Sequence, residues 1–461
     1  MIPLYTATQT REWDAFTIKN EPISSEALME RAANAFVKWF VDKFTTKERI
    51  AVVCGKGNNG GDGIIIGKLL TSGKFEVKVF RIEEDKDLDL DPFTIIIDAI
   101  FGTGLSRPVH SEIIQKINSS KALKISVDVP SGLRIDAPSE GDIVKADHTI
   151  TFQTPKLSFM FPENAQFTGE FHVVDIGLSK AFKSDTKTFY VDDVHALLHK
   201  RRKFAHKGDF GRALLIAGGI GKMGACVLAS RAALRSGVGL LTVHVPKCGY
   251  YIIQTSVPEA MATIDVAEDH FSDAGDAATY DVVGIGPGIG VTSSTVAGLR
   301  RVLQSGKRMV IDADALNILA GSRELMHLIP AGSILTPHPG EFKRLTGDWK
   351  NDFERLELQR QLAAQTKSVV ILKGAHTSIA DPDGTVYFNS TGNPGMAKGG
   401  SGDVLTGVLT GLLSQGYPDI QAATIGVFIH GHAGDLAVAK IGENSILAGD
   451  IVDFLGQSFG H

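Results

Sequence analysis

The chain has 461 residues, of which 43% are hydrophobic and 21% charged, with a formal net charge of −5. The length is too great for one ordinary core and favours two domains of roughly 200 residues or more each. The charge excludes a typical nucleic-acid partner, no apolar run approaches the ~18 residues of a membrane span, and three scattered cysteines make neither a disulfide framework nor a metal cage. Fifty glycines, clustered after strand-like runs, indicate an α/β protein with nucleotide-binding loops. We expect a cytoplasmic protein that acts on small molecules, with no nucleic acid and no membrane partner.

The first half of the chain alternates helices and strands. Hydrophobic periodicity predicts helices over residues 8–20, 24–44 and 64–70 and strands over residues 49–54, 76–82, 94–97 and 124–127. A glycine-rich loop, residues 55–63, follows the first strand, and Gly55, Gly57 and Gly60 fit the dinucleotide-binding fingerprint. This match alone is a weak signal.

Polar side chains follow three of these strands. Asn58, Asn59 and Asp62 bring amide and carboxylate oxygens to the first loop, where they suit a phosphate, a carbohydrate hydroxyl and a cation together. Asp98 follows the strand 94–97 and Asp128 follows the strand 124–127. Because the carboxyl ends of parallel strands meet in one crevice, we expect these groups to share a site. The alternative for each aspartate is a cap, but three strand ends that each supply one favour function.

These motifs together resemble the N-terminal domain of the bifunctional nicotinamide-nucleotide hydrate repair enzymes. The resemblance covers about residues 1–190 and rests on residues 55–63, 98–104 and 127–132. It implies a Rossmann-like epimerase that interconverts the R and S forms of hydrated NADH and NADPH. Ala33 stands where the family pattern has glycine, a departure that concerns helix packing rather than chemistry.

The resemblance also implies a substrate site, a potassium site and a group for proton transfer. The hydrated cofactor would be lined by Asn58, Asn59, Gly60, Gly61, Asp62, Gly102, Thr103, Gly104, Leu105, Ser106, Arg107, Pro108 and Asp128. Potassium would be held by Asn59, Asp98 and Ser131. Inverting a hydroxyl-bearing carbon beside the ring nitrogen, by ring opening or loss of water, needs a positioned acid or base, for which Asp128 is the candidate. Whether Asp128 moves the proton or only binds substrate stays open.

The segment that joins the two halves, residues 190–207, is rich in charged residues and histidines. We place the boundary near residue 192, which gives domains 1–191 and 192–461. His195 and His199 are four residues apart and suit a metal on a helix, but no acidic or cysteine partner stands at matching spacing. A solvated linker is the preferred interpretation.

The second half returns to alternation. The pattern predicts a helix over residues 225–236, a hairpin about residues 381–384, three C-terminal helices, and strands over residues 213–217, 240–245, 281–285, 308–311, 333–335 and 368–372. Most strands end in polar or glycine-rich loops, which predicts a doubly wound sheet with its site at one edge. The loop after the first of these strands imitates a Walker A motif but lacks the Ser or Thr after Lys222, so we reject a P-loop.

A second glycine-rich stretch, residues 393–403, precedes the apolar run 404–413. Crowded glycines at a helix N-terminus expose backbone N–H groups to an anion such as phosphate. A carboxylate there, Asp403, is repelled unless it accepts a proton or holds a metal, which indicates a base aimed at a hydroxyl beside a transferable phosphoryl group. The alternative is an aspartate N-cap on a glycine-rich turn.

The order of elements resembles the ribokinase-like superfamily and, through residues 207–211, 336–341 and 399–405, the dehydratase domain of the same repair enzymes. That domain uses ADP in bacterial members and ATP in eukaryotic ones, with Mg²⁺, to remove water from the S hydrate. The implied hydrate contacts are Ala225, Gly288, Gly290, His338 and Asp403. The implied nucleotide contacts are Lys373, Gly374, Ala375, His376, Thr377 and Gly402. Which glycine of residues 286–290 faces the ligand stays open.

Several histidines in this half have structural alternatives. His338 stands between two prolines and suits a structural role as well as a substrate contact. His430, His432 and Asp435 look metal-like, but polar caps on a packed helix are the preferred interpretation.

Both halves imply one bifunctional enzyme that epimerises the hydrates and dehydrates the S form, converting ADP to AMP and phosphate. We expect two doubly wound three-layer α/β domains and a homo-oligomer. One alternative is a small-alcohol kinase of the ribokinase type with a regulatory nucleotide-binding domain, which would release a stable phosphorylated product. In another, the first half is a binding module only. The sequence leaves open ADP against ATP and NADH hydrate against NADPH hydrate.

Overall fold

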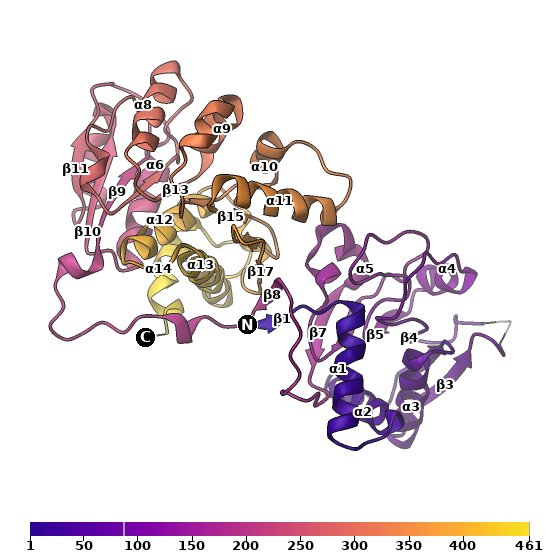
Figure 1. Ribbon diagram of the computed structural model, residues 1–461. Coiled ribbons are helices and arrows are strands. Elements are labelled where there is room, and N and C mark those ends of the chain that lie inside the picture. The colour runs from indigo at the N-terminus through magenta and orange to yellow at the C-terminus, as the bar shows by residue number, and fades with distance from the viewer. Residues whose placement is uncertain (86–87, 461) are drawn as a thin grey trace. The chain divides into compact units, whose positions relative to one another are not determined.

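The computed structural model describes residues 1–85 and 88–460 (Figure 1). The chain divides into two compact units: the first unit comprises residues 2–188 with 351–353, and the second unit comprises Met1 with residues 189–350 and 354–461. Each unit has its own hydrophobic core. Within the described residues, no helix combines the length and the hydropathy needed to cross a membrane.

The first unit is built on a six-stranded parallel sheet in the order β3-β2-β4-β5-β6-β7. Its strands are β2 Arg49–Cys54, β3 Glu76–Arg81, β4 Ile95–Ala99, β5 Leu123–Val127, β6 His148–Phe152 and β7 Glu170–Val174, and a short β1 spans Ile2–Pro3. Its helices are α1 Ala7–Asn20, α2 Ser25–Lys43, α3 Asn58–Ser72, α4 Glu112–Ser119 and α5 Ala165–Thr168. The strand order reverses between β2 and β4, where ligands of open parallel sheets bind.

The side chains of β2 show how the layers form. Ile50 and Val52 join a buried cluster with α2 and α3, whereas Ala51 and Val53 join another with α4. Both faces are apolar because helices cover both, as is usual for parallel sheets. The predicted Rossmann-like three-layer fold of this half is confirmed.

Two features differ from the prediction. Strands β6 and β7 were not anticipated, and α3 begins at Asn58 rather than near residue 64, so the polar residues placed in a loop lie in its first turns. Glycine weakens a helix, which is why the pattern hid this start. Here it is required for packing, because a Cβ on Gly60 would collide with the Gly55 carbonyl oxygen and one on Gly63 would stand 2.5 Å from the Ala99 Cβ.

A matched pair of substitutions tests this packing. Gly60→Ser is expected to lower the free energy of unfolding by roughly 1–3 kcal/mol, because the backbone must move to admit the new Cβ. Gly57→Ser is the control: nothing lies within 4 Å of its Cβ position, its φ is −86°, and serine is a favoured N-cap at this start of α3. Thermal unfolding should show a lower midpoint only for Gly60→Ser, and equal midpoints would contradict the collision.

The second unit has a mixed sheet in the order β8-β17-β16-β15-β14-β13-β12-β9-β10-β11. Its strands are β8 Thr188–Val191, β9 Arg212–Ile216, β10 Leu240–Val245, β11 Met261–Ile264, β12 Val282–Ile285, β13 Met309–Ile311, β14 Ile334–Leu335, β15 Val369–Leu372, β16 Ser378–Ala380 and β17 Val386–Asn389. The pairs from β11 to β15 are parallel, and β16 and β17 form the predicted antiparallel hairpin. The strand order reverses between β9 and β12.

Helices cover both faces of this sheet (Figure 1). They are α6 Met223–Arg235, α7 Tyr250–Ser256, α8 Ser293–Gln304, α9 Ala313–Gly321, α10 Pro339–Thr346, α11 Asp352–Thr366, α12 Ser401–Ser414, α13 Asp419–Ile441 and α14 Ala448–Ser458. Helix α12 is buried continuously from Val404 to Ser414 and packs with α13 and α14 against the sheet. The predicted doubly wound sheet and three C-terminal helices are confirmed.

Candidate active sites

The first candidate site lies where β2, β4 and β5 end. Asp98, at the end of β4, is fully buried; Ser131 Oγ donates to its Oδ1 at 2.5 Å, and Ser126 Oγ and the Ser131 amide donate to Oδ2 at 2.9 and 2.8 Å. Burial raises the pKa of Asp98, and these bonds oppose the rise. Asn59 lies against Gly102, where an added Cβ would be 3.2 Å from the Asn59 amide carbon.

The three residues implied for potassium are linked through the segment 101–102. Asp98 and Ser131 are in contact, and the Phe101 amide donates to Ser131 Oγ at 2.8 Å one residue before the glycine that faces Asn59. Their carboxylate, hydroxyl and amide oxygens are donors of the kind that hard cations prefer. The buried Asn59 Nδ2 has no hydrogen-bond partner, so its N–H groups are available to an acceptor on a bound molecule rather than to a cation.

Asp128 follows β5 in an unusual backbone conformation, with φ of 63°. Such positive φ in a non-glycine residue stores strain and is concentrated at functional sites. Its Oδ1 accepts from Thr151 Oγ1 at 3.2 Å and from the Phe152 amide at 3.1 Å, and it lies 3.2 Å from Lys156 Nζ. The Lys156 side chain is 1% exposed and also donates to two backbone carbonyls at 3.0 Å, so its ammonium is fixed beneath Asp128.

The negative charge of Asp128 acts on two further carboxyl groups, those of Asp62 and Asp14. Burial, followed by the charges of Asp128 and Asp14, raises the pKa of Asp62 to about 8. Burial and then Asp128 raise the pKa of Asp14 to about 6, with Lys156 opposing. A pKa near 8 favours the protonated form of Asp62 at pH 7. Its buried Oδ1 has no hydrogen-bond partner.

Sequence reasoning missed Asp14 and Lys156. Asp14 lies on α1, far from any glycine motif, and Lys156 follows β6, a strand that the pattern did not reveal. The remaining substrate candidates form a turn after β4, in which the Leu105 amide donates to the Gly102 carbonyl at 3.3 Å. Residues 104 and 106–108 of this turn are exposed.

The second candidate site surrounds the start of α12. Gly400 has φ of 97°, a conformation that favours glycine, and α12 begins at the next residue. His430 Nε2 donates to the Ser401 carbonyl at 3.0 Å. Burial lowers the pKa of His430 to about 4, so the ring is neutral and supports the helix start. Among the described residues, His430, His432 and Asp435 do not gather as metal ligands.

Asp312 follows β13 and connects this strand to Lys373 and to the start of α12. Its Oδ1 lies 2.9 Å from Lys373 Nζ, and its Oδ2 accepts from Thr406 Oγ1 of α12 at 2.8 Å. A Cβ on Gly402 would stand 3.4 Å from the same ammonium. The lysine charge is thereby held against the first turn of α12, where an anion would bind.

Asp403 stands in this first turn. Burial, followed by the charge of Asp312, raises its pKa to about 6; Lys373 opposes the rise and Asp314 adds to it. A carboxyl group with a pKa close to neutral and a partly buried position is suited to accept a proton during catalysis. Asp312 and Asp314 were noted in the sequence only as a polar strand end.

The candidate substrate contacts lie on loops at the same sheet edge. The Gly290 amide donates to Asp314 Oδ2 at 2.9 Å, which ties the loop 286–290 to the residue that influences Asp403. Gly288 faces Lys222, and Ala225 is half-buried on α6. His338 caps α10: its Nδ1 accepts from the Gly340 amide at 3.0 Å, and its side chain is 50% exposed. Its Nε2 lies 3.3 Å from Glu341 Oε1, so in this structure both ring nitrogens have partners within α10.

The candidate nucleotide segment, residues 373–377, is a closed turn between β15 and β16. Thr377 Oγ1 accepts from the Gly374 amide at 3.2 Å and donates to the Gly374 carbonyl at 2.9 Å. Burial lowers the pKa of His376, so its ring is neutral. The turn begins at Lys373 and so adjoins the start of α12 through Gly402.

The histidines at the join do not form the metal pair considered from sequence. His195 lies in a short 3-10 turn, His195–Leu197, with its Nδ1 2.5 Å from Asp193 and its Nε2 3.0 Å from the Ser458 carbonyl. His199 stacks on Tyr417 with ring centroids 4.0 Å apart.

Comparisons with known proteins match both units. A family model described as NAD(P)H-hydrate dehydratase matches residues 213–456, and one described as YjeF-related protein N-terminus matches residues 25–92 and 81–158. Bifunctional NAD(P)H-hydrate repair enzymes of Moorella thermoacetica and Coxiella burnetii are 35% and 36% identical to this chain, covering 98% and 99% of it and 96% and 99% of their own lengths. A ribokinase-like superfamily protein of Enterococcus faecalis is 27% identical with a TM-score of 0.54, covering 60% of this chain and 97% of its own.

Proposed function

The chain belongs to the family of bifunctional NAD(P)H-hydrate repair enzymes, and on that premise we propose which residues perform each of its two reactions. It is a bifunctional enzyme, an NAD(P)H-hydrate epimerase and dehydratase. Residues 1–191 carry the epimerase and residues 192–461 the dehydratase, with ADP as the phosphoryl donor. The positions of the two family-model matches support this division.

In the dehydratase, Asp403 takes the proton of the hydroxyl on the S hydrate. The freed oxygen attacks the terminal phosphorus of ADP, and AMP leaves. Phosphate then leaves the ring carbon, a proton leaves the adjoining carbon to solvent, and NAD(P)H is restored. Backbone N–H groups of residues 399–402 and the Lys373 ammonium stabilise charge on the transferred group. The place of Asp403 in the first turn of α12, one residue after the Gly402 that faces Lys373 Nζ, carries this assignment, and its raised pKa supports it.

The remaining residues of this site are proposed to bind the two substrates, the hydrate and the nucleotide. Ala225, Gly288, Gly290 and His338 bind the hydrate, and residues 373–377 with Gly402 bind the nucleotide. Mg²⁺ is proposed to enter the site together with ADP. When bound, Mg²⁺ neutralises charge on the phosphates.

In the epimerase, the charged pair of Asp128 and Lys156 provides the base and its positioning cation. Neutral Asp62 provides an acid that donates a hydrogen bond at pH 7. Residues 58–62 and 102–108 line the hydrated cofactor. The oxygens of Asn59, Asp98 and Ser131 fit potassium, which when bound supplies positive charge that orders these loops.

The pH dependence of the dehydratase tests the role of Asp403. A base must be deprotonated, so kcat is expected to rise through pH 6 and to level above pH 7. Asp312→Asn removes the negative charge that raises the pKa of Asp403, so its acid limb should move to lower pH. The nucleotide titrates in the same way with the wild type and with Asp312→Asn. A difference between the acid limbs of their two pH profiles therefore reports the Asp403 carboxyl group, and identical acid limbs would contradict the assignment.

Absorbance at 340 nm tests the whole function. Hydrated NADH, as a mixture of R and S forms, is incubated with the protein, Mg²⁺, K⁺ and either ADP or ATP. Recovery of the entire mixture supports both assignments, and the faster nucleotide identifies the donor. Recovery of the S fraction alone would make the first unit a binding module, and nucleotide consumption with an alcohol but no recovery would favour the kinase alternative.

We also propose a homo-oligomer in a reducing cytoplasm. Cys54, Cys226 and Cys248 are all free thiols, and burial raises the pKa of Cys54 and of Cys226 to about 12, which makes both unreactive. Light scattering coupled to gel filtration measures the assembly, and a monomer mass would reject the oligomer.

A further inference from the structure

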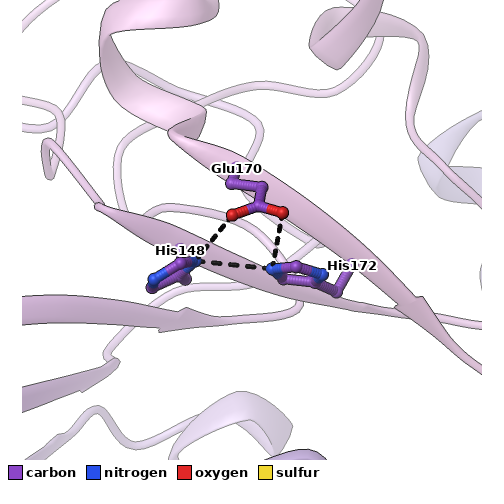
Figure 2. Close-up of side chains that lie close together, drawn as sticks. All are labelled: His148, Glu170 and His172. Atoms are coloured by element: carbon purple, nitrogen blue, oxygen red, sulfur yellow. Dashed lines mark hydrogen bonds and ion pairs between the residues drawn. The ribbon is translucent and has the colours of Figure 1, made fainter. Parts of the chain in front are cut away.

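A cluster of two histidines and one glutamate lies on the edge of the first unit's sheet, outside both candidate active sites. His148 begins β6, and Glu170 and His172 stand on the neighbouring β7. The register pairs His148 with Glu170, and His172 lies two residues along, so all three side chains project from one face. Figure 2 shows the two rings and the carboxylate turned toward one another.

The distances within this cluster do not suit ordinary hydrogen bonds. His148 Nδ1 lies 3.4 Å from His172 Nε2 and 3.6 Å from a Glu170 oxygen, and His172 Nε2 lies 3.7 Å from the other oxygen. Hydrogen bonds from N–H to oxygen are about 2.7–3.2 Å long. By contrast, ligands bound tetrahedrally at about 2.0–2.2 Å from Zn²⁺ stand about 3.3–3.6 Å apart. The two ring nitrogens therefore stand as far apart as two zinc ligands do, and one Glu170 oxygen lies within 4.8 Å of both.

The surroundings hold the ligands in this arrangement. The Trp39 ring of α2 lies 4.9 Å from the His172 ring and 5.5 Å from the His148 ring, which restricts both imidazoles. The histidine side chains are 26% and 21% exposed and Glu170 is 69% exposed, which leaves room for water as a fourth ligand.

We propose that His148, Glu170 and His172 form a Zn²⁺ site that fastens edge strand β7 to β6. Two imidazole nitrogens and one carboxylate oxygen are a donor set that this ion prefers. The site lies at the amino ends of these strands, whereas Asp128 and Lys156 lie beyond the carboxyl ends of β5 and β6, so the metal stabilises the unit and takes no part in epimerisation. The inference does not rest on the proposed reactions.

Cobalt titration of the full chain tests the site. Protein freed of metal with a chelator is titrated with Co²⁺ in excess Mg²⁺, which competes for sites made only of carboxylates. The expected result is one equivalent of Co²⁺ with the strong visible absorption of four-coordinate cobalt, displaced by Zn²⁺. Trp39 emission should be quenched as this equivalent binds, and Trp39→Phe should lose that quenching.

Substitutions of the three proposed ligands test where the metal binds. His148→Gln and His172→Gln should each lose the absorption, whereas His110→Gln, an exposed histidine of the same unit, should titrate as the wild type does. Zn²⁺ should raise the thermal midpoint of the wild type but not of these two variants. If they fail to fold, the exposed Glu170→Gln is expected to weaken Zn²⁺ binding more than about tenfold. Unchanged titration in all three variants would overturn the site, as would the absence of visible absorption.

Discussion

Asp403→Asn is expected to lower kcat of the dehydratase by about 10²–10⁴-fold, because it removes the group that takes the hydroxyl proton. The amide has the same shape and stays in the first turn of α12, so the helix and its phosphate-binding N–H groups are kept. The KM for ADP should change little. The measurement is the initial rate of absorbance recovery at 340 nm with the S hydrate and saturating nucleotide.

The control for Asp403→Asn is Asp453→Asn, which removes the same charge from an exposed position of α14 and should leave both activities unchanged. Epimerisation by Asp403→Asn should also be unchanged, since Asp128 and Lys156 belong to the first unit. If Asp403→Asn dehydrates at more than about one tenth of the wild-type rate, Asp403 is a cap or a metal ligand and not the base.

Asp128→Asn is expected to slow epimerisation by about 10²–10⁴-fold while leaving dehydration of the S hydrate intact. With excess ADP, the wild type should restore the R and S mixture completely, whereas the variant should restore the S fraction and then proceed at the uncatalysed rate of interconversion. The slow phase at 340 nm measures this loss.

Lys156→Met separates positioning from proton transfer. Removing one partner of a buried ion pair costs about 3–5 kcal/mol of stability, because Asp128 is left charged and unpaired. The variant should therefore unfold at a lower temperature, and its epimerisation should slow because Asp128 loses the cation that positions it. A wild-type rate of epimerisation in a folded variant would show that Lys156 does not act through Asp128.

Mixing the two catalytic variants provides a joint control. Asp403→Asn retains the epimerase and Asp128→Asn retains the dehydratase, so an equimolar mixture should restore the entire R and S mixture that neither restores alone. Complementation shows that each variant is folded and that the substrate exchanges between molecules through solution. Failure of the mixture would indicate that one substitution damages both units.

The sequence by itself determined the fold class and the positions of the chemistry-bearing loops. Strand β2 was predicted to the residue, and the hairpin of β16 and β17 and the three C-terminal helices follow from periodicity and turn residues. Asp98 and Asp128 were singled out because several neighbouring strand ends each supply a polar group, and Asp403 because a carboxylate is repelled from an anion site unless it accepts a proton or holds a metal. Each of these signals lies within one short segment, so the sequence alone reveals it.

The tertiary structure decided what depends on neighbours distant in the chain. Lys156 lies beneath Asp128 only because β6 pairs with β5, and β6 is too weakly patterned to be recognised. Asp62 is neutral because burial and two other carboxyl groups raise its pKa, a sum that no single segment contains. His148, Glu170 and His172 become neighbours through the parallel register of two strands joined by a long crossover. Spacing along the chain encodes periodicity and loops, whereas charge state and metal geometry arise from packing across strands.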